Sequence, residues 1–432
     1  MYRRTFIQSM LGAAALSAQT PGRRPPNLVF LLADDLGYAD LGCYGSPDIR
    51  TPHIDSIARD GLRFTDCYAN APVCTPTRVG FLTGRYQQRY GKDLEWALGP
   101  NNNKTAGLLP NQTVLPSALK RAGYRTGIFG KWHVGWRPES RPMRHGFDEF
   151  FGILLGNVDM YTHKYHDGSH DLWHNEDPER ATGYLTELLA GRAARFIENN
   201  ASNPFFLYLP FNAVHWPFQV PGRPEPATSA NWRDGTRKDY ARMTEAMDAA
   251  VGHVLDTLRR RGLDDNTLVV FTNDNGGERL SDSGPFFHTK GTLFEGGIRV
   301  PAVARWPGVI PAGKQTAQVC ATMDFTATFL KAAGADSAPL DGVDLLPVLS
   351  GKSPEFERPL YWRIDQPGRR QLAVRRGRWK YIDDNSGNRG FPELLFDLAA
   401  DPSERRNLYY DNQELAAELR RSLLAWEKEV TA

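Results

Sequence analysis

The chain has 432 residues, of which 41% are hydrophobic and 24% are charged. This balance is typical of a folded globular protein and excludes wholesale disorder, and the length allows a large core with a smaller appended domain. The 52 basic and 50 acidic residues leave a net charge of only +2, and there are four cysteines. These numbers exclude binding of nucleic acid through bulk charge and also exclude a disulfide scaffold.

The first residues, Met1–Gln19, are predicted to be an export signal. Arg3 and Arg4 precede an apolar stretch from Met10 to Ala18 that ends in small residues suited to cleavage. The adjacent arginines are similar to a twin-arginine signal, and a general secretory signal is the alternative. No later run reaches the 18 apolar residues of a membrane span. The sequence therefore predicts a periplasmic or secreted protein without a membrane span.

Short apolar runs alternate with helical patterns along the first 350 residues. Continuous apolar runs of this length are typical of strands buried on both faces, and their alternation with helices predicts a doubly wound α/β core. The expected strands are Asn27–Ala33, Arg125–Phe129, Phe205–Phe211 and Thr267–Thr272. The expected helices are Thr51–Gly61, Thr113–Ala122, Thr182–Asn199 and Tyr240–Arg261.

The pattern changes after about Gly351, where short strand candidates follow one another through turns. We expect a small antiparallel sheet and one helix, over Leu360–Ile364, Gln371–Arg375, Trp379–Ile382, Leu394–Leu398 and Gln413–Val430. The predicted organisation is an export signal over 1–19, a catalytic α/β domain over 27–350 and a C-terminal α+β subdomain over 355–432.

Polar clusters follow several of the expected strands. Asp34 and Asp35 come directly after one strand, and Asp274 and Asn275 follow another. In an open α/β sheet, ligands bind beyond the carboxyl ends of the strands. Adjacent buried carboxylates favour a hard divalent cation, Ca²⁺ or Mg²⁺ rather than zinc. Either cluster alone is also explained by helix N-capping, but the two together favour a metal site.

Cys74 begins the segment CTPTR, in which Pro76 is expected to mark a helix start and Arg78 lies one turn later. A cysteine at a positive helix N-terminus is predicted to be an activated nucleophile. The alternative is a buried structural cysteine, and for Cys43, Cys67 and Cys320 we expect that alternative.

The chain resembles the type I sulfatases of the alkaline phosphatase superfamily. That family carries a C-x-P-x-R signature, whose cysteine is converted to formylglycine, followed by L-T-G-R; here these are CTPTR and LTGR. Thr77 takes a position that serine often holds. The resemblance implies a large mixed, mostly parallel sheet sandwiched by helices. Further matching stretches are LLADDLGYADLGCYG, TPHIDSIARDG, GKWHVG, HGFDEFFG, TNDNGG, KGTLFEGG and LFDLAADPSERRNL.

The resemblance also implies the ligands and the catalytic groups. One Ca²⁺ is expected, with the ligands Asp34, Asp35, Cys74 (modified), Asp274 and Asn275. One hydroxyl of the hydrated aldehyde at residue 74 attacks sulfur, and deprotonation of the second hydroxyl then expels sulfate. The expected catalytic residues are Cys74, Arg78, Lys131, His133, His215 and Lys290.

Each catalytic residue has an implied role. His133 is the base for the second hydroxyl, and His215, with Lys290, contacts the bridging oxygen and protonates the leaving group. Arg78 and Lys131 orient the diol and the sulfate oxygens. As alternatives, Lys131 and Lys290 are ordinary solvated lysines and His215 is a hydrogen-bonded loop histidine. His145 and Asp148 are assigned to structure.

Four of the ten histidines fall within Met160–Asn175, together with several aromatic residues. This composition is typical of a polar, aromatic rim of a sugar pocket or of an exposed loop, and less so of a second metal site. The histidines are His163, His166, His170 and His174.

These observations predict an exported sulfatase that acts on sulfate esters, with a sulfated carbohydrate as substrate. Its expected partners are the sulfated substrate and a formylglycine-generating maturation enzyme, with no nucleic acid. The alternatives are a phosphodiesterase or phosphonate monoester hydrolase on the same scaffold, and a catalytically silent binder of sulfated glycans.

Overall fold

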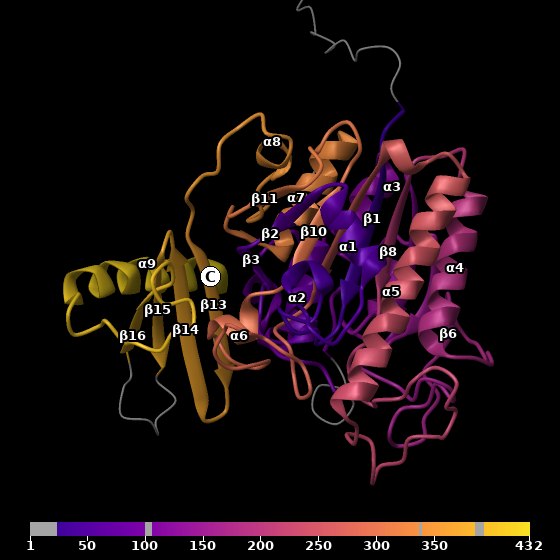
Figure 1. The fold of residues 1–432 in the computed structure, drawn as a ribbon, viewed down its shortest axis with the longest axis horizontal. Coiled ribbons are helices and arrows are strands. Elements are labelled where there is room, and N and C mark those ends of the chain that lie inside the picture. The colour runs from indigo at the N-terminus through magenta and orange to yellow at the C-terminus, as the bar shows by residue number, and fades with distance from the viewer. Residues whose placement is uncertain (1–23, 100–105, 337–338, 385–392) are drawn as a thin grey trace, which may run out of the picture.

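The computed structural model describes residues 24–99, 106–336, 339–384 and 393–432, and the predicted export signal lies outside them. A ten-stranded sheet runs through the larger part of the molecule (Figure 1). In spatial order its strands are β11 (Lys314–Thr316), β2 (Leu62–Phe64), β10 (Ala302–Arg305), β9 (Thr267–Asn273), β1 (Asn27–Ala33), β8 (Phe205–Pro210), β4 (Arg125–Lys131), β5 (Glu149–Ile153), β6 (Trp173–His174) and β7 (Asp177–Pro178).

The four strands expected from the sequence are the four central neighbours, β9, β1, β8 and β4. They pair in parallel, with Leu28 opposite both Phe206 and Leu268. All seven residues of β1 are buried, because helices cover both faces of the sheet. The short strand β10 pairs antiparallel with both of its neighbours, β9 and β2, so the sheet is mixed and mostly parallel, as expected.

Helices on the two faces of this sheet complete two hydrophobic cores, because alternate side chains of each strand point to opposite faces. Val29 and Leu31 belong to one core, and Leu28 and Phe30 to the other. The first core is closed by α1 (Pro52–Arg59), α4 (Leu185–Asn199) and α5 (Arg237–Arg260). The second is closed by α2 (Cys74–Thr83), α3 (Leu115–Arg121) and α7 (Thr322–Ala333).

A second sheet lies beside the first and is antiparallel throughout, as the change of pattern after Gly351 predicts. Its strands, in spatial order, are β13 (Leu360–Gln366), β14 (Arg369–Arg376), β15 (Trp379–Asp384) and β16 (Glu393–Asp397). The helix α9 (Gln413–Thr431) packs on it through Leu419 and Leu423 (Figure 1). The fold class expected from the sequence is therefore confirmed.

The remaining elements are short. They are the strand pair β3 (Cys67–Tyr68) and β12 (Cys320–Ala321), the helices α6 (Glu295–Ile298) and α8 (Leu346–Leu349), and the 3₁₀ turns at Gly42–Tyr44, Gln87–Tyr90, Lys92–Glu95, Pro138–Ser140, Pro142–His145 and Asp264–Asn266. None of the described helices combines the length and the apolar composition that a membrane crossing requires.

A buried ion cluster joins the second sheet to the first. Lys380, on β15, lies with its Nζ 2.8 Å from Glu295 Oε1 and 2.9 Å from Glu404 Oε1, and all three side chains are fully buried. Glu295 also accepts a hydrogen bond from the Tyr68 hydroxyl, at 2.6 Å. Since α6 closes the loop that begins at Lys290, the second sheet holds that loop against the larger sheet.

Candidate active site

The carboxyl ends of the four central parallel strands meet at one edge of the large sheet. Asp34 and Asp35 follow β1, Asp274 and Asn275 follow β9, and Lys131 is the last residue of β4. Main-chain hydrogen bonds continue past the strand ends and fix these positions, for example from Asp274 N to Ala33 O at 3.3 Å. The two acidic clusters therefore lie together, because their strands are neighbours.

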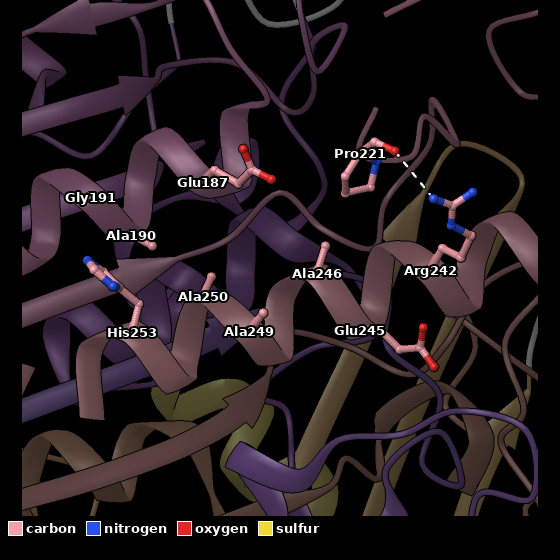
Figure 2. Close-up of a pocket in the computed structure, with 10 residues that line it drawn as sticks. All are labelled: Glu187, Ala190, Gly191, Pro221, Arg242, Glu245, Ala246, Ala249, Ala250 and His253. Atoms are coloured by element: carbon pink, nitrogen blue, oxygen red, sulfur yellow. Dashed lines mark hydrogen bonds between the residues drawn. The ribbon is translucent and has the colours of Figure 1, made fainter. Parts of the chain in front are cut away.

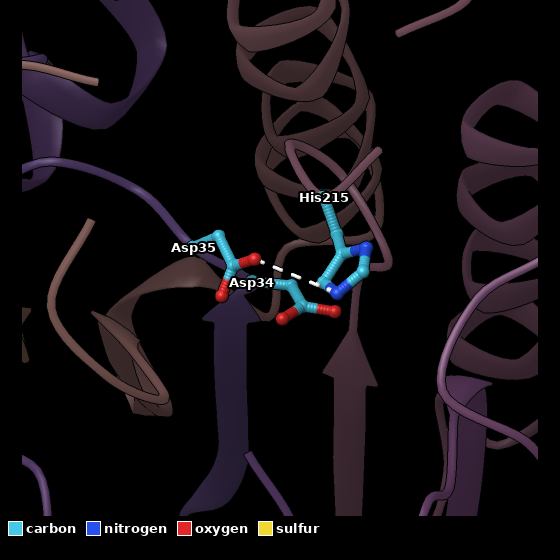
Figure 3. Close-up of side chains that lie close together, drawn as sticks. All are labelled: Asp34, Asp35 and His215. Carbon is cyan, nitrogen blue, oxygen red and sulfur yellow. Dashed lines mark ion pairs between the residues drawn. The ribbon is translucent and has the colours of Figure 1, made fainter. Parts of the chain in front are cut away.

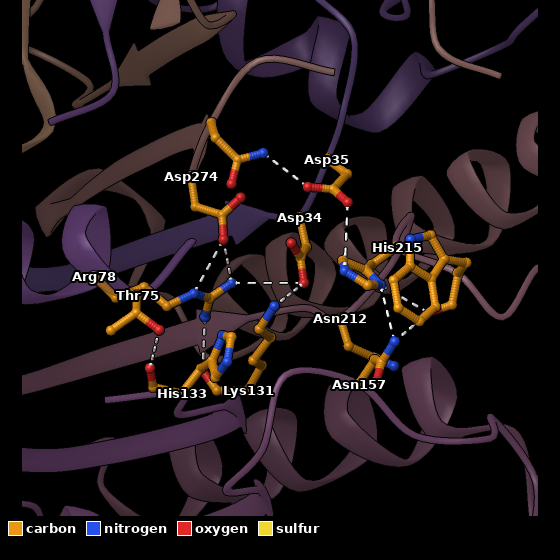
Figure 4. Close-up of polar contacts among 12 residues, drawn as sticks. Asp34, Asp35, Thr75, Arg78, Lys131, His133, Asn157, Asn212, His215 and Asp274 are labelled. Carbon is orange, nitrogen blue, oxygen red and sulfur yellow. Dashed lines mark hydrogen bonds and ion pairs between the residues drawn. The ribbon is translucent and has the colours of Figure 1, made fainter. Parts of the chain in front are cut away.

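Each of the three carboxylates uses one oxygen to bind a cation. Lys131 Nζ lies 2.6 Å from Asp34 Oδ2, and Arg78 Nη2 lies 2.7 Å from Asp274 Oδ2 (Figure 4). Lys290 Nζ lies 2.6 Å from Asp35 Oδ1. The Lys131 and Arg78 side chains are fully buried, and that of Lys290 is 15% exposed. These lysines are therefore not ordinary solvated lysines.

The other oxygen of each carboxylate and the amide oxygen of Asn275 are buried without a hydrogen-bond partner. These atoms are Asp34 Oδ1, Asp35 Oδ2, Asp274 Oδ1 and Asn275 Oδ1. A buried polar atom without a partner is costly, so four of them at one place indicate a site that binds a ligand. Oxygen atoms of this kind are the donors that Ca²⁺ prefers.

The imidazole ring of His215 lies beside the carboxylates of Asp34 and Asp35 (Figure 3). Its Nε2 is 3.5 Å from Asp35 Oδ2, and ligand atoms of Asp34, Asp35 and His215 all lie within 4.8 Å of one another. The Nδ1–H donates to the carbonyl oxygen of Trp216 at 2.7 Å, which leaves Nε2 directed at the acidic cluster. Burial lowers the pKa of His215 well below its usual range, although Asp35 raises it.

His133 follows β4 and is also buried. Its Nε2 lies 2.7 Å from the carbonyl oxygen of Leu98, an acceptor, so Nε2 carries the proton and donates it. The other nitrogen, Nδ1, is buried and has no partner. Burial lowers the pKa of His133 well below its usual range, and Lys131 lowers it further, so the ring is neutral with a free acceptor at Nδ1.

The backbone at two of these residues is strained. Asp35 has φ 63° and His133 has φ 55°, in the left-handed region that non-glycine residues rarely adopt. Such positions cost about 1–3 kcal/mol and concentrate at functional sites.

Charge and burial compete at the carboxylates. Burial raises the pKa of Asp34 to about 7, helped by Asp274 and opposed by Lys131. Burial also acts to raise the pKa of Asp35, but Lys290 and His215 outweigh it and hold that pKa below its usual range. Burial acts to lower the pKa of Lys290, and Asp35 outweighs it, so this lysine is charged.

Cys74 is the first residue of α2, and Arg78 lies one turn later, as the sequence predicts. The helix begins two residues before Pro76, where we expected its start. The prediction of an activated thiol is wrong for the cysteine itself: burial raises the pKa of the Cys74 thiol, although Lys131 and Lys290 oppose this. The side chain is 2% exposed, so the unmodified thiol is a poor nucleophile.

Three polar groups of the site were not predicted. Asn157 donates to the Trp216 carbonyl at 3.0 Å, and Thr75 donates to the His133 carbonyl at 2.8 Å (Figure 4). Glu278 accepts from Trp216 Nε1 at 2.8 Å. Glu278 lies three residues after Asn275 and was accessible to strand-end reasoning, whereas Asn157 has no such signal because it lies on a loop after β5.

The four clustered histidines do not form a second metal site. Within the described ranges, groups of three or more His, Cys, Asp or Glu side chains gather at metal-binding distance only at Asp34, Asp35 and His215. His163 is buried, and His166 is exposed beside the ring of Tyr165. His170 and His174 contact Glu179 through its backbone and its side chain, respectively.

The other cysteines and the HGFD stretch are structural. Cys67 and Cys320 are buried free thiols opposite one another on β3 and β12, and Cys43 is a partly buried free thiol. His145 packs against Trp132, with ring centroids 5.4 Å apart, and Asp148 accepts hydrogen bonds from Thr126.

A surface pocket of about 530 Å³ lies between α4 and α5 (Figure 2). Small residues such as Gly191 and Ala250 line it, with Glu187 and Arg242 at its margin. It contains none of the candidate site residues, and it is therefore not the reaction site.

Comparison with known proteins identifies the family. The sulfatase family model matches residues 26–335, and a model described as N-sulphoglucosamine sulphohydrolase, C-terminal, matches residues 285–429. The N-acetylgalactosamine-6-sulfatase of Canis lupus familiaris is 37% identical over 400 residues, which cover 86% of this chain and 74% of the relative. Arylsulfatase A of Bos taurus is 36% identical over 453 residues, covering 94% and 87%.

Solved structures agree with this match. The crystal structure of Ps i-CgsB superimposes with a TM-score of 0.85 at 32% identity, covering 93% of each chain. The phosphonate monoester hydrolase of Agrobacterium radiobacter shares the fold, with a TM-score of 0.67 at 22% identity, covering 94% of this chain and 96% of that one. The chain belongs to the sulfatase family and is a sulfuric ester hydrolase.

Proposed function

We propose that this sulfatase removes sulfate from a sulfated sugar, using a formylglycine made from Cys74 and one bound Ca²⁺. The observation that carries the proposal is the set of four buried oxygens without partners, beside a cysteine at a helix N-terminus. The residues that would hold the ion are Asp34, Asp35, Asp274 and Asn275, together with the modified Cys74.

The charge of the site supports a cation and an anionic substrate together. Three carboxylates, those of Asp34, Asp35 and Asp274, face three basic side chains, those of Arg78, Lys131 and Lys290. A divalent cation on the free carboxylate oxygens would leave the site net positive. A positive, water-poor site favours a sulfate ester and the negative charge that grows on the leaving oxygen.

Conversion of Cys74 to formylglycine would replace a thiol that is a poor nucleophile, because burial raises its pKa. When present, the hydrated aldehyde would supply the nucleophilic oxygen, and the Ca²⁺ would lower the pKa of that hydroxyl. His133 is suited to accept a proton at Nδ1, which is neutral, buried and free of other partners. Its orientation is fixed by the bond from Nε2–H to Leu98 O.

His215 is placed to protonate the leaving oxygen through Nε2 once that nitrogen has taken up a proton, which the carboxylate of Asp35 favours. Its Nδ1–H is tied to the Trp216 carbonyl, which directs Nε2 at the site, within 3.5 Å of Asp35 Oδ2. The neighbouring Lys290 ammonium would contact the same bridging oxygen. Arg78 and Lys131, held by the carboxylates, would orient the sulfate oxygens.

A sugar sulfate as substrate is supported by the relatives. N-acetylgalactosamine-6-sulfatase is 37% identical to this chain, and Ps i-CgsB, at 32% identity, is known in complex with k-i-k-neocarrahexaose. We further propose that residues 27–350 carry the reaction and that residues 355–432 support the loop of Lys290 through Lys380. The proposal includes export through the segment Met1–Gln19 and a formylglycine-generating maturation enzyme as a partner.

The test is the mass of the tryptic peptide Phe64–Arg78, from protein made in a host that contains a formylglycine-generating enzyme. We expect the mass of an aldehyde or its hydrate at residue 74, localised by fragmentation, and hydrolysis of 4-nitrophenyl sulfate in preference to 4-nitrophenyl phosphate esters. C74A should fold and show no turnover. An unmodified Cys74 in that host, with tight glycan binding and no sulfate release, would overturn the proposal.

A further inference from the structure

The site opens to solvent on the side of His215 and Lys290. Their side chains are 8% and 15% exposed, whereas those of Arg78 and Lys131 are fully buried. The part of a substrate that extends away from the sulfate must therefore leave the site past His215 and Lys290. The residues that line this exit decide which sugars fit.

Trp216 lies at this exit and is held at both ends. Its ring centroid is 4.4 Å from that of His215, and its carbonyl accepts hydrogen bonds from His215 Nδ1 at 2.7 Å and Asn157 Nδ2 at 3.0 Å. At the other end, its Nε1–H donates to Glu278 Oε2 at 2.8 Å. The indole is therefore a fixed platform directly beside the leaving-group histidine.

Arg233 lies over this platform. Its Cζ is 4.6 Å from the centroid of the Trp216 ring, and the residue is exposed. Among the described residues, no hydrogen bond or ion pair engages its guanidinium. Two nearby arginines differ, because Arg223 pairs with Asp239 at 3.9 Å and Arg237 pairs with Asp40 at 2.7 Å.

The N–H donors of this guanidinium remain available for a ligand. The Cζ of Arg233 lies over the indole, and since no hydrogen bond or ion pair of the described residues uses its N–H groups, they can bind an oxyanion through two parallel hydrogen bonds. Glu278, the carboxylate beside the platform, accepts a hydrogen bond from Trp216 Nε1 and forms no ion pair with Arg233, although the charge of Arg233 opposes the rise that burial causes in the pKa of Glu278. This carboxylate therefore does not occupy the N–H donors of Arg233.

We propose that Arg233, stacked on Trp216, is a binding site for a second anionic group of the substrate, a sulfate or a carboxylate next to the ester that is cleaved. This assignment rests on the proposed function, because it defines the substrate of the same site. The preferred substrate is a sugar that carries two oxyanions, and a singly charged sulfate ester binds less tightly.

The experiment compares four substrates with the matured enzyme: 4-nitrophenyl sulfate, a monosulfated hexosamine, the same sugar with a second sulfate, and a disaccharide of the monosulfated sugar with a uronate. For wild type we expect a lower KM for at least one doubly charged sugar than for the monosulfated one. R233A should raise that KM about tenfold and leave kcat/KM for 4-nitrophenyl sulfate within twofold, since one charge-assisted bidentate contact is lost. R233K should lie between.

The matched control is R261A, which removes another exposed arginine. Arg261 lies between the end of α5 and the start of β9, so it is at the amino end of that strand, whereas the site is at the carboxyl ends. It should change none of the four values. The doubly charged substrate whose KM responds to R233A identifies the second group as sulfate or carboxylate. Equal loss on 4-nitrophenyl sulfate would overturn the proposal, because Arg233 would then act by positioning Trp216 and His215. No effect on any substrate would also overturn it.

A measurement of ligand binding tests the role of Arg233 independently of the proposed sulfatase reaction. Calorimetric titration of C74A with each sugar needs no turnover, and the R233A change in this background should weaken only the doubly charged ligand, by about tenfold. A wild-type enzyme that cleaves no sulfate ester would refute the proposed function, while the titration would still decide whether Arg233 binds a second oxyanion.

Discussion

Lys131 Nζ and Asp34 Oδ2 form a fully buried ion pair at 2.6 Å, although their strands, β4 and β1, are separated in the sheet by β8. The pair spans the end of the intervening strand and occupies one oxygen of Asp34, and the other oxygen has no partner. Asp274 likewise binds Arg78 through Oδ2, while its Oδ1 has no partner. The fixed cations thus hold the carboxylates in place and leave one oxygen of each for an ion.

Removal of calcium should lower both activity and thermal stability of the wild type, and added Ca²⁺ should restore them. An ion that binds only the folded state at 100 times its Kd stabilises it by about 2.7 kcal/mol. D274N should abolish this calcium response in a melting experiment with a chelator and Ca²⁺. D167N, at an exposed acid, should keep it. A wild type whose melting temperature ignores the chelator would contradict the calcium site.

H215A should lose activity in proportion to how poor the leaving group is. General acid catalysis contributes about 10²–10⁴-fold where the leaving oxygen needs a proton, and little where it does not. We expect a fall of that size in kcat/KM for a sugar sulfate and less than tenfold for 4-nitrophenyl sulfate. H166A, at an exposed histidine, is the control. Equal losses on the two substrates would show that His215 is not the acid.

K380M should unfold at markedly lower urea concentration than the wild type. The substitution leaves Glu295 and Glu404 buried without the ammonium that now lies 2.8 and 2.9 Å from them, and breaking such a pair costs about 3–5 kcal/mol. K428M, on the exposed side of α9, should be neutral. An unchanged urea midpoint for K380M would show that the cluster does not stabilise the junction of the two sheets.

Glu404 should make stability fall as the pH rises from about 4.5 to 7. Burial raises the pKa of Glu404 from 4.5 to about 7, against the effect of Lys380, so the folded state holds a proton that the unfolded state has released in this window. The contribution is complete below pH 4.5 and lost above pH 7, on the order of 3 kcal/mol. E404Q should flatten this part of the profile of unfolding free energy against pH. A profile with the wild-type slope would contradict the shifted pKa.

G130A and G191A should change stability in opposite directions. Gly130 has φ +141°, and a Cβ there would lie 1.9 Å from the carbonyl oxygen of Pro210, so alanine should cost about 2–4 kcal/mol. Gly191, inside α4, has open space around such a Cβ, and alanine should stabilise by up to about 1 kcal/mol. Urea unfolding measures both. Equal unfolding free energies for the two variants would refute the close approach of Gly130 on β4 to the Pro210 carbonyl on β8.

The main elements were predictable because their signals are local. The run Asn27–Ala33 is apolar throughout and forms β1 with the same bounds, and the helix expected over Thr182–Asn199 forms α4 over Leu185–Asn199. The short strands β2, β10 and β11 were not predicted. Each has only three or four residues, too few to show a periodicity, and forms only because neighbouring strands supply its partners.

The convergence of the polar clusters was predictable for a general reason: parallel strands place their carboxyl ends at one edge. The reactivity of Cys74 was not. A helix N-terminus and a nearby arginine favour the thiolate, but the pKa of the thiol depends on how completely the surrounding chain removes water, and burial prevails.

The sequence by itself determined the α/β class, the antiparallel C-terminal sheet, the sulfatase family and the residue types at the strand ends, because these depend on hydrophobic patterning and on motifs within short segments. The tertiary structure alone decided the strand order β9–β1–β8–β4, which carboxylate oxygen binds which cation, and the stacking of Arg233 on Trp216. Those relationships join residues far apart in the chain, and their energies depend on distance and burial, which exist only after the elements have packed.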